Sequence, residues 1–208
     1  MNVLVTAGPT REPIDPVRYL TNRSSGKMGY ALASAFAARG HHVLLVSGPT
    51  ILEVPEAVDF LRIETAAEMH AAVEQSISRQ QIVICAAAVA DYRPAMVAAQ
   101  KIKKHDESLI LELVRTVDIL GSIRQPMGFT GKLIGFAAET ERLEEHAREK
   151  LLGKGCDLII ANDVSQPGIG FDANENKVLL VYRDHSVSLP QSSKSHLAEE
   201  LANIILNI

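Results

Sequence analysis

The chain has almost no cysteine and few aromatic side chains. Cys85 and Cys156 are its only cysteines, and both lie in apolar, strand-like runs. This pattern is typical of a reduced, cytoplasmic protein, and a zinc site would need more ligands. Tryptophan is absent and aromatic residues make up only 4% of the chain. The sequence therefore lacks the stacking platform with which many proteins bind single-stranded nucleic acid.

An excess of positive charge is also missing. The formal net charge is −4 at pH 7, whereas proteins that bind nucleic acids through their phosphates carry a basic excess. No apolar run approaches the ~18–20 residues that a bilayer span requires. The first residues also lack the basic and apolar regions of a secretory signal. These absences predict a cytoplasmic protein with neither nucleic acid nor membrane as a partner.

The sequence does contain enough apolar residues for one core. Hydrophobic residues make up 47% of the 208 residues, and the charged fraction of 22% is close to the globular average, which excludes wholesale disorder. A chain of this length buries a core without disulfides or a structural metal. No internal repeat, low-complexity tract or long linker divides it, so we predict a single domain over residues 1–208.

Strand-like and helical segments alternate along the chain. Apolar runs predict strands over 2–6, 42–47, 59–64, 81–87, 132–137 and 157–161. Periodicity predicts helices over 25–39, 65–80, 140–152 and from about 194. Ser24 or Ser25 is expected to cap the first helix, and Thr65 with Glu68 forms a capping box for the second. The alternation indicates a Rossmann-like, doubly wound α/β fold whose mainly parallel sheet is covered on both faces.

The C-terminal part departs from this alternation. Residues 177–182 and 186–189 flank a polar turn, which predicts an antiparallel hairpin. The hairpin is followed by the closing helix, so the sheet is expected to end in two strands that are not parallel to the rest.

Open parallel sheets bind ligands at the carboxyl ends of their strands. The loop over residues 7–27 lies there and is far longer than an ordinary connection, which favours a function. It contains Gly26-Lys27 but matches neither a Walker loop nor the GxGxxG pattern. Backbone N–H groups at Ser24 to Gly26, beside Arg23 and Lys27, favour a bound anion. An anion site and a plain helix cap both remain open at this point.

Other candidate residues are ambiguous by themselves. Asp91 follows small residues at a strand end, where it suits a metal, a ribose hydroxyl, a base edge or a simple turn. Taken alone, Lys150 and Lys154 would be expected only to complement the dipole of a helix at its C-terminal end. Phe136 would be expected to be a core residue. Cys85 fits packing better than a nucleophile. These residues leave both a nucleotide-using enzyme and a dinucleotide-dependent reductase open.

Several motifs occur in order along the chain and carry a family resemblance. They are the segments 6–19, 22–29, 86–92, 101–104, 135–140 and 161–164. Together they closely resemble phosphopantothenate–cysteine ligase, the phosphopantothenoylcysteine synthetase of coenzyme A biosynthesis. The resemblance covers essentially the whole chain. This family has its own nucleotide-binding variant of the doubly wound sheet, which accounts for the failure of the two standard phosphate patterns.

The resemblance implies a two-step ligation. The carboxylate of 4′-phosphopantothenate attacks the α-phosphate of CTP and releases pyrophosphate, and the amine of L-cysteine then attacks the acyl-cytidylate and releases CMP. Lysine and Mg²⁺ are expected to stabilise the developing charge. The animal enzyme uses ATP, which is one alternative. An NAD(P)-dependent reductase and a non-catalytic subunit are two others; the missing GxGxxG disfavours the first, and intact Asn22 and Lys101 disfavour the second.

The resemblance also implies roles for individual residues. Asn22 matches the position that holds the acyl-nucleotide, and Lys101 matches the lysine needed to form it. The implied nucleotide-binding residues are Lys101, Cys85, Ala86, Ala87, Asp91, Val117, Asp118, Ile119, Leu120, Phe136, Lys150 and Lys154. The family usually has Asn-Pro before Asp118, and this chain has Thr116-Val117 instead. We therefore expect Val117 to act through its backbone.

Family members are homodimers whose active site is completed across the contact. The hairpin over 177–189 is the surface expected to form it. In most bacteria the ligase is the C-terminal half of a bifunctional protein, fused to a flavin-dependent decarboxylase. The resemblance covers the ligase half, so we expect no flavin in this chain.

Overall fold

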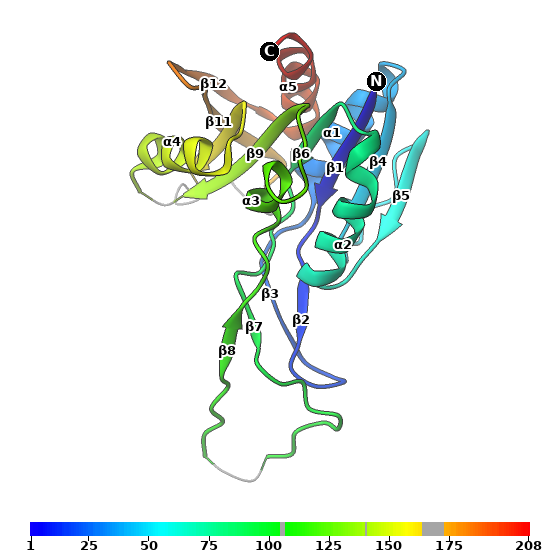
Figure 1. Ribbon diagram of the computed structural model, residues 1–208, viewed down its shortest axis with the longest axis vertical. Helices are drawn as coiled ribbons and strands as arrows, with labels where there is room; N and C mark the ends of the chain where they lie inside the picture. Colours follow the sequence, from blue (N-terminus) through cyan, green and yellow to red (C-terminus); the bar gives the residue numbers. More distant parts are fainter. Residues whose placement is uncertain (105–106, 140, 164–172) are drawn as a thin grey trace.

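The computed structural model describes residues 1–104, 107–139, 141–163 and 173–208. An eight-stranded sheet forms its centre, in the order β12-β11-β10-β9-β6-β1-β4-β5 (Figure 1). Its strands are β1 (Asn2–Ala7), β4 (His42–Ser47), β5 (Val58–Arg62), β6 (Ile82–Cys85), β9 (Lys132–Glu139), β10 (Leu158–Asp163), β11 (Glu175–Val181) and β12 (Ser186–Ser193). Neighbours from β10 to β5 pair in parallel, and β11 and β12 are antiparallel additions. The doubly wound fold and the C-terminal hairpin are both confirmed.

Helices cover both faces of the sheet. One face packs against α1 (Lys27–Ala38) and α5 (Lys194–Asn207). The other packs against α2 (Ala66–Ser76), α3 (Ile119–Arg124) and α4 (Leu143–Lys154), with the short turn η1 (Ile77–Arg79) after α2. Successive side chains of a strand point to opposite faces of the sheet. Because both faces are buried, successive positions along a central strand are apolar, which explains the continuous apolar runs in the sequence. No helix in the described part of the chain is long and apolar enough to cross a bilayer.

The start of α1 differs from the prediction. The residue that caps it is Gly26, at φ 80, and no side chain caps the helix. The expectation that Ser24 or Ser25 caps α1 is therefore wrong, because the chain enters the helix through a left-handed turn that glycine adopts without strain. The Ser24 hydroxyl instead accepts a hydrogen bond from the Gly26 N–H at 3.3 Å. The Thr65–Glu68 capping box of α2 is confirmed.

Several predicted boundaries were also wrong. The helix predicted to reach residue 80 ends as α2 at Ser76, and η1 follows it. Strands β9 and β10 each run two residues further than predicted, to Glu139 and Asp163. The helix predicted over 140–152 begins at Leu143 and continues to Lys154. Its predicted first residue, 140, lies outside the described residues, as do residues 164–172.

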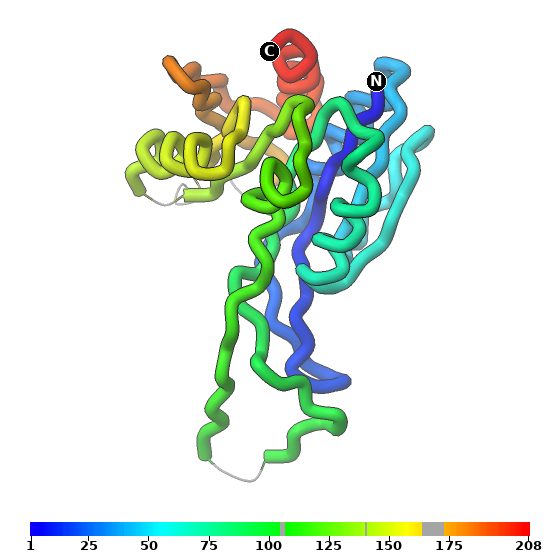
Figure 2. The backbone as a smooth tube through the Cα atoms, viewed as in Figure 1, coloured from blue at the N-terminus to red at the C-terminus, as the bar shows by residue number. Residues whose placement is uncertain are grey.

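An arm projects from the sheet at the carboxyl ends of its strands (Figure 2). We define it as residues 11–21, 92–104 and 107–115. It contains two small antiparallel ladders, one between β2 (Arg11–Pro13) and β3 (Tyr19–Thr21), the other between β7 (Tyr92–Pro94) and β8 (Leu113–Arg115). The sequence predicted only long loops here, because strands of three residues are too short to show periodicity.

Candidate active site

A cavity of about 770 Å³ lies at the carboxyl edge of the sheet. Strand β1 leads on to α1 on one face, whereas the neighbouring β6 leads on to α3 on the other face. Thr6 of β1 and Cys85 of β6 both line the cavity. The cavity therefore occupies the switch point of the sheet, where open α/β folds bind their ligands.

All the predicted site residues but one line this cavity. They are Asn22, Cys85, Ala86, Ala87, Asp91, Val117, Asp118, Ile119, Leu120, Phe136, Lys150 and Lys154. They come from the loop after β3, the end of β6 and its loop, the start of α3, strand β9 and helix α4. The exception is Lys101, which is exposed and lies in the arm between β7 and β8.

The floor of the cavity consists of backbone and small side chains. Asn22 donates from Nδ2 to the Ala88 carbonyl at 2.8 Å, and the Ala88 N–H donates to the Gly8 carbonyl at 2.9 Å. The Ala87 N–H donates to the Thr6 hydroxyl at 3.3 Å. These bonds fix the Asn22 amide against the floor, and the small side chains allow a ligand to approach the backbone closely.

The N-terminus of α1 opens into the cavity. Ser24, Ser25, Gly26 and Lys27 all line it. The N-cap residue Gly26 offers no capping side chain, and the helix dipole favours a negative group near this end of α1. Lys27 donates from Nζ to Asn174 at 2.8 Å. The arrangement suits an anion, which is one of the two interpretations that the sequence left open.

Asp118 joins α3 to α4 at the opposite wall. Its Oδ1 accepts the Gly121 N–H at 2.9 Å and so caps α3, while its Oδ2 forms an ion pair with Lys154. Burial opposes ionisation of Asp118, but the hydrogen bonds from Lys154 and Gly121 and the charges of both lysines leave its pKa below the usual value. Lys150 donates to the Phe136 carbonyl at 2.8 Å. Two lysines are thereby held at fixed places on this wall.

Cys85 lines the cavity but is not activated. Burial raises the pKa of its thiol to about 12, and Cys156 behaves in the same way. The thiol is therefore protonated at neutral pH, whereas a nucleophile requires the thiolate. These observations agree with the packing role inferred from the sequence.

Several polar residues of the cavity were not among the predicted site residues. Asn162, Asn176 and Lys194 are all buried and line it. Strand β11 runs antiparallel to β10, which puts its first residues at the carboxyl edge, and β12 then delivers the start of α5 to the same edge. Glu139 also lines the cavity, and His146 Nδ1 lies 3.2 Å from its Oε2. Asn162 and Glu139 lie in the motif segments 161–164 and 135–140, whereas only the strand order could have revealed Asn176 and Lys194.

A resident metal site is not evident from the side chains alone. Among residues 1–104, 107–139, 141–163 and 173–208, no group of three or more His, Cys, Asp or Glu is arranged to hold a metal ion.

Comparison with known proteins gives consistent matches. The family model of the DNA/pantothenate metabolism flavoprotein C-terminal domain matches residues 1–208. The coenzyme A biosynthesis bifunctional protein CoaBC of Vibrio cholerae is 48% identical over 205 residues, which are 98% of this chain and 51% of that protein. The chain thus spans about half the length of the curated relatives it matches.

Solved structures agree with these matches. The crystal structure of the C-terminal domain of a CoaBC protein superposes with a TM-score of 0.83 at 42% identity, covering 99% of this chain and 94% of that one. A Cab2 variant solved in complex with phosphopantothenate-cysteine gives a TM-score of 0.79 at 17% identity, covering 99% of this chain and 85% of that one. At that low identity the second match shows a common fold alone.

Proposed function

The chain belongs to the family of DNA/pantothenate metabolism flavoprotein C-terminal domains, and from this membership we propose that it is a phosphopantothenate–cysteine ligase of coenzyme A biosynthesis. The observation that carries the proposal is the cavity at the switch point, which gathers Asn22, a floor of small residues and the cations Lys150 and Lys154. The sequence identity between this chain and bifunctional coenzyme A biosynthesis proteins supports the proposal.

The first step proposed is formation of an acyl-nucleotide. A carboxylate oxygen of 4′-phosphopantothenate bonds to the α-phosphorus of CTP while the bond from that phosphorus to the β-phosphate oxygen breaks, and pyrophosphate leaves. Two highly anionic substrates must meet, so cations that stabilise the developing charge dominate this step. The first turn of α1 with Lys27 on one wall, and Lys150 and Lys154 on the other, suit that task.

The second step is attack by cysteine. Its amine bonds to the acyl carbon and gives up a proton, the bond from that carbon to the CMP oxygen breaks, and 4′-phosphopantothenoylcysteine and CMP are released. We assign Asn22 to hold the acyl-cytidylate, because a neutral amide donates to an acyl oxygen without forming an ion pair. Its bond to the Ala88 carbonyl fixes the amide in advance, which is what a transition-state donor requires.

We propose CTP rather than ATP as the nucleotide. Residues 85–87, 117–120 and Phe136 line the cavity, and we assign them to the base. The resemblance to the bacterial type, with Lys150 and Lys154 present, favours CTP.

The cavity residues fit a magnesium ion that arrives with the nucleotide. Mg²⁺ usually binds through one or two carboxylates together with substrate phosphates and water, so a cluster of three protein ligands is not required. Asp91 and Glu139 are carboxylates on the cavity wall and would hold it. Bound there, Mg²⁺ would neutralise part of the triphosphate charge. We expect no flavin in this chain, and we propose a cytoplasmic location.

The test is pyrophosphate release with 4′-phosphopantothenate, cysteine and Mg²⁺, comparing CTP with ATP. We expect release with CTP. Release with ATP alone would keep the ligation and overturn the nucleotide assignment, and release with neither would overturn the proposal.

Asn22→Ala should slow product formation by about 100-fold or more. Asn207→Ala is the control, because Asn207 also donates to a backbone carbonyl, that of Asn203, but at the end of α5.

We also propose that the protein is a homodimer. The hairpin β11–β12 ends the sheet and offers an edge strand, as the sequence suggested. The arm exposes more apolar surface than the hairpin does, since Met96 is 86% exposed and Ile110 is 92% exposed. Lys101 lies in this arm and outside the cavity of its own chain. A dimer in which the arm reaches the partner's cavity would bring Lys101 to the reacting groups.

A further inference from the structure

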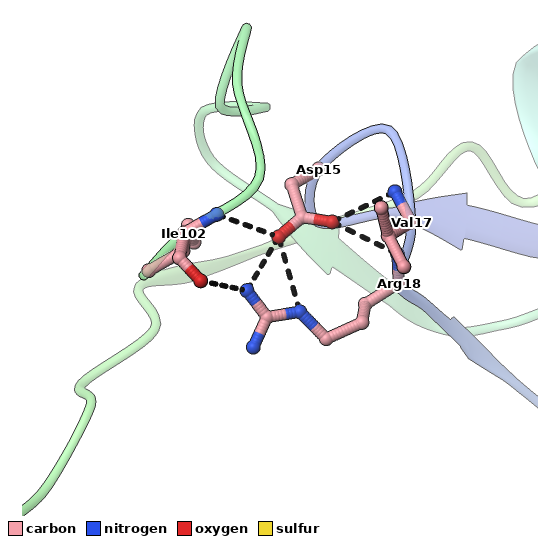
Figure 3. Close-up of polar contacts among 4 residues, drawn as sticks. All are labelled: Asp15, Val17, Arg18 and Ile102. Atoms are coloured by element: carbon pink, nitrogen blue, oxygen red, sulfur yellow. Dashed lines mark hydrogen bonds and ion pairs between the residues drawn. The ribbon is translucent and has the colours of Figure 1, made fainter. Parts of the chain in front are cut away.

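Asp15 is a buried carboxylate that does not line the cavity. It lies in the turn between β2 and β3, and none of its side chain is exposed. Its Oδ1 accepts the N–H groups of Val17 and Arg18 at 2.8 and 2.9 Å, and its Oδ2 accepts the Arg18 Nε at 3.0 Å (Figure 3). An ion pair with Arg18 Nη2 completes the contact. The Asp15–Arg18 pair is thus built into the turn.

This pair also holds a distant part of the chain. The Ile102 N–H donates to Asp15 Oδ2 at 3.1 Å, and the Ile102 carbonyl accepts from Arg18 Nη2 at 2.9 Å (Figure 3). Both backbone groups of one residue are therefore bound. The planar guanidinium makes this geometry available, since it donates to the carboxylate and to the carbonyl at once.

The residue next to Ile102 is Lys101. Residues 101–104 form neither helix nor strand, and Lys101 itself is exposed. Among the described residues, Asp15 and Arg18 are the partners of the hydrogen bonds that tie residues 101–104 to the rest of the chain. A second bond nearby, from the Ala98 N–H to the Ile14 carbonyl at 3.0 Å, holds the same part of the arm to the same turn.

We propose that Asp15 and Arg18 are positioning residues for Lys101, holding Ile102 by both of its backbone groups so that the Lys101 ammonium is presented in a fixed place. This inference rests on the proposed function, in which Lys101 helps to form the acyl-nucleotide. A misplacement of about 1 Å in a reacting group can cost about 100-fold in rate, so a flexible segment would carry this lysine poorly.

The charge state of the pair is compatible with this role. Hydrogen bonds from Arg18, and from the N–H groups of Val17, Ile102 and Arg18, outweigh burial and hold the pKa of Asp15 far below its usual value. Asp15 is therefore ionised throughout the neutral range, and the contact with Ile102 persists wherever the enzyme would act.

The test uses Arg18→Lys and Asp15→Asn. Lysine keeps the charge but lacks the fork that binds both Asp15 and the Ile102 carbonyl. The Arg18 side chain is 43% exposed, so we expect the variant to fold. Asp157→Asn is the matched control, because Asp157 also accepts from an arginine (Arg124, 2.8 Å) and from a backbone N–H (Leu133, 2.7 Å), but on the sheet.

The first measurement needs no enzyme activity. Trypsin cleavage after Lys101, Lys103 and Lys104, followed by mass spectrometry, should be about tenfold faster in Arg18→Lys and Asp15→Asn, because opening of a local contact exposes the backbone. Asp157→Asn should leave these cleavages at the original rate. Equal cleavage in all variants would overturn the proposal.

The second measurement is pyrophosphate release. The kcat should fall about 10- to 100-fold in Arg18→Lys, while the Kd for CTP measured by calorimetry stays unchanged. In a Lys101→Ala background, Arg18→Lys should cause no further loss, because both changes would remove the same interaction. An additive loss, or loss of the dimer in parallel with the rate, would overturn the proposal. If the unchanged protein releases no pyrophosphate, the proposed function fails, but the cleavage comparison still decides whether Asp15 and Arg18 hold the segment.

Discussion

The floor of the cavity carries a cysteine whose environment keeps it inert. Burial raises the pKa of Cys85 to about 12, so its thiolate fraction near pH 7.5 is negligible. Cys85→Ala should release pyrophosphate at a rate within about threefold of the unchanged protein, because the substitution is only a modest packing change at a strand end. Iodoacetamide at pH 7.5 should leave the activity unchanged. Inactivation by iodoacetamide that excess CTP prevents, with Cys85 alkylated, would contradict this expectation.

The ion pair between Lys154 and Asp118 gives a prediction for nucleotide binding. Lys154→Met removes a cation from the cavity wall and the hydrogen bond that lowers the pKa of Asp118. Loss of one charge-assisted contact should raise the Kd for CTP about 10- to 100-fold by calorimetry. Lys177→Met is the control, because Lys177 is exposed on β11 and does not line the cavity. An unchanged Kd in Lys154→Met would remove Lys154 from the binding site.

Individual site residues were predictable where a local motif carries them. Asn22, Asp91 and Asp118 follow strand ends or begin a helix, and their motifs gave their positions in the cavity. Asn176 and Lys194 lack such a signal, because they reach the cavity only through the antiparallel addition of β11 and β12. Nearest-neighbour sequence patterns contain no information about that strand order.

At the scale of elements, helix α1 depends on a close approach to β1. A Cβ on Gly29 would lie 2.5 Å from the Ala7 Cβ, far inside van der Waals contact. Gly29→Ala should therefore force α1 away from the sheet and destabilise the protein by about 1–3 kcal/mol. Denaturant unfolding would measure the change.

The control for that experiment is Gly153→Ala in α4. A Cβ there meets nothing within 4 Å, and alanine favours the helix by about 0.5–1 kcal/mol over glycine. The two glycine-to-alanine changes should therefore shift the free energy of unfolding in opposite directions. Equal shifts would show that helix propensity, rather than the approach of α1 to β1, decides the outcome.

Elements with many residues were predicted better than short ones. The main strands and helices show their period over several residues and were identified with small boundary errors. Helix α3, with six residues, and the three-residue strands of the arm were missed. Their stability comes from contacts with distant segments, such as Arg11 N–H to the Glu64 carbonyl at 2.8 Å, so local preference alone does not determine them.

At the scale of the whole molecule, two surfaces are candidates for the contact of the proposed homodimer. Ile110 on the arm is 92% exposed and Val187 on β12 is 42% exposed. If the arm forms the contact, Ile110→Asp should convert the dimer to a monomer in sedimentation at micromolar concentration, because a buried unpaired charge is costly. Val187→Asp should then leave the dimer intact. The reverse pattern would locate the contact on the hairpin, and a monomeric unchanged protein would exclude both.

The backbone floor of the cavity has a consequence for inhibition. Contacts to residues 86–88 would be made to peptide groups that Asn22, Thr6 and Gly8 already hold in place. A compound that packs on this backbone would depend little on side-chain identity, and a larger residue here would also intrude on the space of the proposed nucleotide. Resistance to such a compound through a single substitution at this floor would therefore also weaken binding of the proposed nucleotide.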